Sequence, residues 1–187
     1  MTDHLIPRFP SLKPEDWSPD QQRVAAEIVA GPRGQLRGPF VPLIYSPELA
    51  SSVQKLGEYL RFKTLLSNAL LELAILVTAR RFRCPNIWHS HRALALKAGL
   101  EPKIIAAIAE DRRPGSMSAE EALIYDFAAG LVEHLAVSDE SFERIVATWD
   151  RRTAMDLAGL CGYYALLAMV LNTARVPLPD GAEPFQA

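Results

Sequence analysis

Helix start signals recur along this chain, and they constrain its fold more than any other feature of the sequence. Two segments open with serine and then proline, Ser18-Pro19 and Ser46-Pro47, and a third reads Ser118-Ala119-Glu120-Glu121. A serine hydroxyl can accept a backbone N–H of the first turn, and proline fits the first helical position because an N–H there would have no partner. No segment shows the two-residue alternation and β-branched enrichment of a strand. The sequence therefore predicts an all-α chain whose helices pack in a bundle.

The same signals divide the chain into an arm, one domain and a tail. Prolines at positions 7, 10, 14 and 19 predict an extended arm over residues 1–18, lying over a surface for which a neighbouring subunit is one candidate. Residues 19–176 form the single predicted domain, and 177–187 form a tail. We expect 31–42, with three glycines and three prolines, to be a loop. Helices are expected near 19–30, 47–62, 67–82, 86–98, from 102, 118–135, from 138, and 150–175.

Charge and composition exclude several classes of partner. The net charge of -2 and the pI near 6.1 give no long-range attraction for nucleic acid or an anionic membrane, so we expect neither. The N-terminus lacks the basic and apolar regions of a secretory signal. The most apolar stretch, Leu157 to Leu171, is shorter than the roughly 20 residues of a spanning helix, which favours a buried core helix. We therefore expect a cytoplasmic protein.

The candidate chemistry lies between Glu72 and His91. Glu72 is surrounded by leucine, isoleucine and valine, and a carboxylate there is costly to bury without a partner. Trp88 and His91 are three residues apart and share one face of the predicted helix from 86 to 98. His89 points elsewhere, so the two histidines form no helical metal pair. With no other metal-ligand spacing in the chain, we expect no metal site and no cofactor.

These residues stand in a run that resembles the carboxymuconolactone decarboxylase family, which also contains the alkyl hydroperoxidase D-type proteins. The run comprises Glu72-Leu-Ala-Ile-Leu, Ala79-Arg80-Arg81, Cys84, Trp88, His91, Ala95 and Ala98-Gly99. Weaker likeness extends over about residues 20–176. The resemblance implies a helical bundle of the alkyl hydroperoxidase D-like type, a subunit that assembles into homo-trimers or homo-hexamers, and a pocket built around the glutamate, the cysteine region and the histidine.

The resemblance also implies two different activities. Peroxidase-type members use a Cys-x-x-Cys pair; Cys84 matches the first cysteine, but Ile87 occupies the second position. Two-cysteine chemistry needs a nearby resolving thiol, and Cys161 is the only other one. Decarboxylase-type members commonly carry a glutamate before the tryptophan, where Ile87 stands again. An alkyl hydroperoxidase D-like peroxiredoxin with chemistry at Cys84 is therefore one alternative, and an oligomeric binding protein without catalysis is another.

The primary hypothesis is a lyase that transfers protons on a small carboxylated lactone or keto acid. His91 is the general acid or base, because imidazole exchanges protons near neutral pH. Glu72 orients its ring, unless it instead forms a structural bridge with an arginine such as Arg80 or Arg175. Arg80 or Arg81 binds the substrate carboxylate, to which the planar guanidinium is suited. Trp88 forms an apolar wall.

Overall fold

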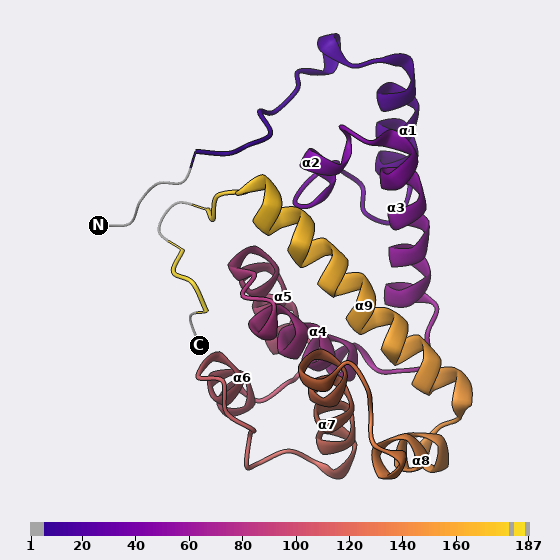
Figure 1. Ribbon diagram of the computed structural model, residues 1–187, viewed down its shortest axis with the longest axis vertical. Helices are drawn as coiled ribbons and strands as arrows, with labels where there is room; N and C mark the ends of the chain where they lie inside the picture. Colours follow the sequence, from indigo (N-terminus) through magenta and orange to yellow (C-terminus); the bar gives the residue numbers. More distant parts are fainter. Residues whose placement is uncertain (1–5, 180–181, 186–187) are drawn as a thin grey trace.

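The chain folds into packed helices, and the computed structural model describes residues 6–179 and 182–185 of it (Figure 1). Within these residues there is no strand, which confirms the predicted all-α class. The elements are a 3-10 helix, Pro14–Asp16, and α1 (Pro19–Ala30), α2 (Phe40–Leu43), α3 (Pro47–Phe62), α4 (Asn68–Arg81), α5 (Pro85–Lys97), α6 (Pro102–Ala109), α7 (Ala119–His134), α8 (Asp139–Thr148) and α9 (Arg151–Ala174).

Local capping explains most of the helix starts. Ser18 and Ser118 each form a complete capping box, with Gln21 and Glu121 as the reciprocal partners. Ser46 precedes α3 as expected, but its side chain makes no capping hydrogen bond. The local start signals present there are Pro47 and the acidic Glu48 in the first turn. The prediction of a continuous loop over 31–42 is wrong at its end, because α2 begins at Phe40. Phe40 is 1% exposed, and tertiary burial, which local composition does not report, stabilises that turn.

Helix α4 lies at the centre of the molecule. Every residue from Leu70 to Ala79 is buried, and the helix packs against α5, α7 and α9. Helix α9 crosses the molecule diagonally, with α1 and α3 on one side and α6, α7 and α8 toward the other (Figure 1). A polar side chain on α4 is therefore enclosed by other helices, and this places Glu72 inside the bundle rather than on its surface.

Helix α9 is longer than its most apolar stretch. It spans 24 residues and is long and apolar enough to cross a membrane by length and composition alone, the one such helix among the described residues. The expectation that this segment is too short to span a membrane is therefore wrong for the whole helix. Half of its most apolar window is buried inside the chain, as in a core helix, while Met155 and Met169 are exposed.

Described residues near both termini contact the bundle. The Arg8 N–H donates to the carbonyl of Ala174 at the end of α9 (2.9 Å), and the Tyr45 hydroxyl donates to the carbonyl of Pro10 (2.7 Å). On the C-terminal side, the ring of Phe185 packs edge-on against Trp88 of α5. Residues 6–18 of the predicted arm thus lie on a surface of their own chain, and residues 1–5 lie outside the described residues. Contact with a neighbouring subunit stays a prediction.

Candidate active site

Helices α4 and α5 bring Glu72 and His91 into direct contact. Nδ1 of His91 lies 2.6 Å from Oε2 of Glu72, although the residues are 19 positions apart. Both are nearly enclosed, with Glu72 7% and His91 8% exposed. A short contact between a carboxylate and an imidazole in such surroundings is a charge-assisted hydrogen bond of the stronger kind. The acid and the imidazole are therefore in contact, and their part in catalysis stays a prediction.

The local sequence fixes how the two helices meet. The hydroxyl of Ser67 accepts the N–H of Leu70 and starts α4, while Cys84 is the N-cap residue of α5 and Pro85 its first residue. Between them Arg83 adopts a positive φ of 48°, which turns the chain sharply enough for α5 to return along α4. His91 then lies on the inner face of α5, together with Trp88 and Ala95.

Two groups from other helices complete the surroundings of this pair. Nη2 of Arg61, in the last turn of α3, lies 3.9 Å from Oε1 of Glu72. The ring of Tyr164, on α9, meets the imidazole edge-on at 5.0 Å between centroids. Sequence reasoning did not single out either residue for the site, because each comes from an element that only the tertiary fold brings to Glu72. The acid is bridged by Arg61, and not by Arg80 or Arg175.

A second tyrosine extends the cluster toward the loop between α1 and α2. The rings of Tyr163 and Tyr164 meet edge-on at 5.3 Å, and Nη2 of Arg33 donates to the Tyr163 hydroxyl at 2.8 Å. Burial raises the pKa of both phenols, and the positive charges of Arg33 and Arg61 partly oppose that rise. A continuous set of contacts therefore joins Arg33, through two tyrosines, to His91.

The two cysteines are buried free thiols. Cys84 is fully enclosed, and this burial raises the pKa of its thiol, although backbone hydrogen bonds from Ile87 and Asn86 work in the other direction. Burial likewise raises the pKa of Cys161 to about 11, against a lowering contribution from a hydrogen bond with Thr78. Both side chains are therefore thiols at neutral pH, whereas nucleophilic sulfur chemistry requires the thiolate.

The structure does not bring Arg80 or Arg81 to the Glu72–His91 pair. Arg80 lies eight residues after Glu72, about 12 Å along the helix axis, and its Nε donates to the carbonyl of Ala109. Arg81 is exposed at the end of α4. Both line a small hollow of about 20 Å³, which holds little more than one water molecule. Trp88 is 1% exposed and is covered by the ring of Phe185, so it is a packed wall.

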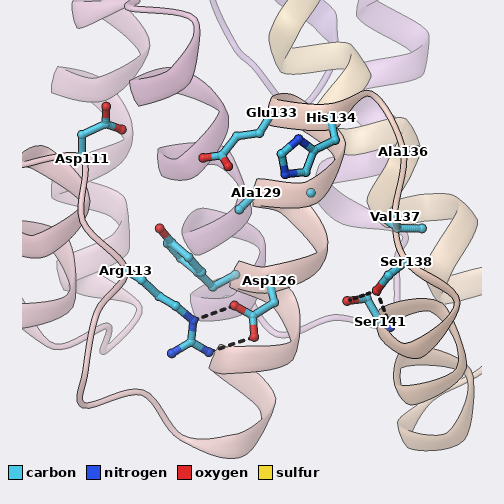
Figure 2. Close-up of a pocket in the computed structure, with 12 residues that line it drawn as sticks. Asp111, Arg113, Asp126, Ala129, Glu133, His134, Ala136, Val137, Ser138 and Ser141 are labelled. Atoms are coloured by element: carbon cyan, nitrogen blue, oxygen red, sulfur yellow. Dashed lines mark hydrogen bonds and ion pairs between the residues drawn. The ribbon is translucent and has the colours of Figure 1, made fainter.

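A larger hollow lies at α7 and the turn into α8 (Figure 2). Its volume is about 440 Å³, and most of its lining side chains are charged or polar; neither Glu72 nor His91 lines it. Its central feature is an ion pair in which Nε and Nη2 of Arg113 donate to the two oxygens of Asp126, at 2.7 and 2.8 Å. The remaining lining residues are Asp111, Tyr125, Ala129, Gly130, Glu133, His134, Ala136, Val137, Ser138 and Ser141.

Comparison with known families adds one decisive observation. Residues 47–128 match the model of the carboxymuconolactone decarboxylase family. The chain is therefore similar to that family over these residues. None of the curated proteins matches the chain.

The matched segment extends from the start of α3 into α7. It contains Arg61, Glu72, Cys84 and His91, so the pair and its nearest cation all lie inside the matched segment. Arg33 and the two tyrosines lie outside it and reach the pair through the fold. The wider likeness seen in the sequence, over about 20–176, is not covered by the match.

Proposed function

We propose that this protein is a proton-transfer enzyme of the carboxy-lyase type, acting on a small carboxylated lactone or keto acid. The observation that carries the proposal is the 2.6 Å contact between Glu72 and His91, two nearly enclosed side chains. A buried acid–imidazole pair within the segment that matches the family suits general acid–base catalysis.

The pair suits the proton step of a decarboxylation. When the bond between a carboxylate and its carbon breaks, carbon dioxide leaves and the electron pair remains on the carbon, delocalised into a neighbouring carbonyl as an enolate. An acid must then protonate that carbon. An ionised Glu72 only accepts hydrogen bonds, so Nδ1 of His91 donates to it, and Nε2 is the ring position that exchanges a proton with substrate. Glu72 thereby orients the ring.

Arg61 supports Glu72 in this proposal. Its guanidinium lies 3.9 Å from the carboxylate oxygen that does not touch His91. This ion pair helps to hold the carboxylate in place beside His91. Because the pair is largely shielded from water, these interactions are stronger than they would be on the surface. Arg61 is thus a positioning residue rather than a group that contacts substrate.

Turnover of a small substrate panel tests the proposal. We would incubate the wild type, His91→Gln and Glu72→Gln with carboxylated butenolide lactones and β-keto acids, and measure released carbon dioxide. Loss of the general acid is expected to lower the rate by about 10²–10⁴-fold. Asp126→Asn, which alters an ion pair outside the site, is the control and should leave the rate unchanged. Wild-type turnover of no panel member, or unaltered turnover by His91→Gln, would contradict the proposal.

The first alternative is peroxidase chemistry at Cys84. The family resemblance supports it, but the thiol is fully enclosed, burial raises its pKa, and Ile87 stands where a second cysteine would be. Titration of free thiols before and after treatment with hydrogen peroxide distinguishes the two activities. Under the proton-transfer proposal both thiols persist; rapid peroxide-dependent loss of both would favour the peroxidase instead.

The second alternative is an oligomeric binding protein without catalysis. The specific observation in its favour is the small exposure of the pair, together with the apolar, buried Ile87 in the preceding turn of α5. Binding of a small carboxylate by a wild type that turns over nothing in the panel would favour this function. Self-association as a trimer or hexamer, and a cytoplasmic location, stay predictions from the sequence; light scattering in solution tests the first.

A further inference from the structure

Arg33 is a half-buried cation without an acidic partner. It lies in the turn after α1, and among the described residues no carboxylate lies within 4.0 Å of its guanidinium. Its Nε is buried and makes no hydrogen bond, while the guanidinium carbon lies 4.4 Å from the centre of the Phe40 ring. A buried donor without a partner costs folding free energy. Among the described residues, no ion pair compensates for the burial of the Arg33 guanidinium.

A glycine on α3 and a tyrosine on α9 fix the position of the Arg33 guanidinium. A Cβ placed on Gly57 would lie 2.1 Å from the Tyr163 hydroxyl oxygen and 2.6 Å from Nη2 of Arg33. Only glycine leaves room there for the 2.8 Å hydrogen bond between those two side chains. Three separate elements thus converge to hold one guanidinium at a fixed position.

That position belongs to the same side-chain cluster as His91. Tyr163 touches Tyr164, and the Tyr164 ring touches the imidazole. Arg61 lies one helical turn beyond Gly57 on α3, but its charge already faces Glu72. Of the two arginines in this cluster, Arg33 therefore carries the unmatched positive charge. Arg80 and Arg81, at the far end of α4, do not supply one.

We propose that Arg33 binds the carboxylate of a small substrate, and that Gly57 and Tyr163 position its guanidinium for this. The inference rests on the proposed function, since it names the cation that anchors the substrate of His91. A guanidinium presents paired donors that match the two oxygens of a carboxylate. The single unmatched positive charge of Arg33 accommodates one carboxylate of the substrate. The reacting end of the substrate would then contact the imidazole of His91.

Calorimetric titration with succinate tests this directly. At constant ionic strength, the wild type should bind succinate saturably and should not bind the neutral succinamide. Arg33→Gln should weaken succinate binding about tenfold or more, the loss expected for a charge-assisted hydrogen bond. Arg37→Gln, an exposed arginine of the same loop, is the matched control and should bind within about twofold of wild type. Undetectable succinate binding by the wild type, or equal binding by Arg33→Gln, would overturn the inference.

Two further variants guard against a folding defect. Arg33→Lys keeps the charge but loses the paired donors, and Tyr163→Phe loses only the hydroxyl that holds Nη2. Each should weaken succinate binding severalfold beyond any change in melting temperature; a lower melting temperature with unchanged affinity would make both residues merely structural. Inorganic phosphate is titrated in parallel, and tighter Arg33-dependent binding of phosphate than of succinate would overturn the carboxylate assignment.

His91→Gln separates this inference from the proposed function. It should bind succinate as the wild type does while losing turnover. If it keeps turnover while Arg33→Gln loses binding, the proton-transfer role fails and the carboxylate site stands. If it loses turnover while Arg33→Gln binds normally, the site fails alone.

Discussion

Two contacts between a carboxylate and a side-chain nitrogen have nearly equal lengths but lie in opposite surroundings in this molecule. Glu72 and His91 meet at 2.6 Å with side chains 9% and 10% exposed, whereas Asp126 and Arg113 meet at 2.7 Å with side chains 35% and 54% exposed (Figure 2). Water and salt screen the second pair, and they screen the first much less. The contact distance alone therefore does not identify a functional pair; the degree of enclosure decides what the contact can do.

The largest expected effect is on the enclosed pair. Glu72→Ala leaves His91 and Arg61 inside the bundle without their acid, and breaking a buried pair in this way costs about 3–5 kcal/mol of unfolding free energy. Urea unfolding measures the loss. A change below about 1 kcal/mol would show that the enclosed pair is energetically no different from a surface pair.

The next effect is expected at Gly57, where the cluster is packed most closely. Gly57→Ala places a methyl group against the Tyr163 hydroxyl, and overpacking of this kind costs about 1–3 kcal/mol. Gly162→Ala on α9 is the matched control, because nothing lies within 4 Å of its Cβ. That change should stabilise the helix by up to about 1 kcal/mol. Thermal unfolding measures the melting temperatures of both variants. A shift of both melting temperatures in the same direction would contradict the expected contrast.

Alkaline pH should reveal the buried thiol beside α4. Because the pKa of Cys161 is raised in the folded chain to about 11, from 9.0, its contribution to stability is complete below pH 9 and is lost as the pH rises through 11. At pH 10 the expected loss of unfolding free energy is about 1 kcal/mol relative to neutral pH. Subtracting the pH profile of Cys161→Ala from that of the wild type isolates this loss from the titration of other groups. Parallel pH profiles of the unfolding free energy in the two proteins would contradict this contribution of Cys161.

The smallest effect is expected at the exposed pair. Asp126→Asn should change the unfolding free energy by less than about 1 kcal/mol, and 1 M salt should remove most of that change. Repeating the urea experiment with and without salt checks both points. A salt-insensitive loss of several kcal/mol would mean that the hollow at α7 and α8 shields its ion pair as the bundle shields Glu72.

Helix starts and motifs formed by neighbouring residues could be predicted from the sequence. Contacts between residues that lie far apart in the sequence could not. The capping boxes at Ser18 and Ser118 act within one turn, so their helices were predictable to within a few residues. The frame from Glu72 to His91 was predictable because the family resemblance runs through it. Arg61 comes from a different helix and Arg33 from a loop, and no local pattern marks either. Helix α2 at Phe40 forms because its side chains are buried, which proline and glycine counts do not report.

Deuterium incorporation from solvent measures the central step of the proposed reaction, which is proton transfer to the substrate carbon. A keto acid whose α-carbon carries exchangeable hydrogens is incubated with enzyme in deuterium oxide, and the exchange is followed by proton nuclear magnetic resonance. We expect the wild type to accelerate exchange at that carbon. The exchange rate with His91→Gln should be lower by about 10²-fold or more. Equal exchange rates in the two proteins would contradict it.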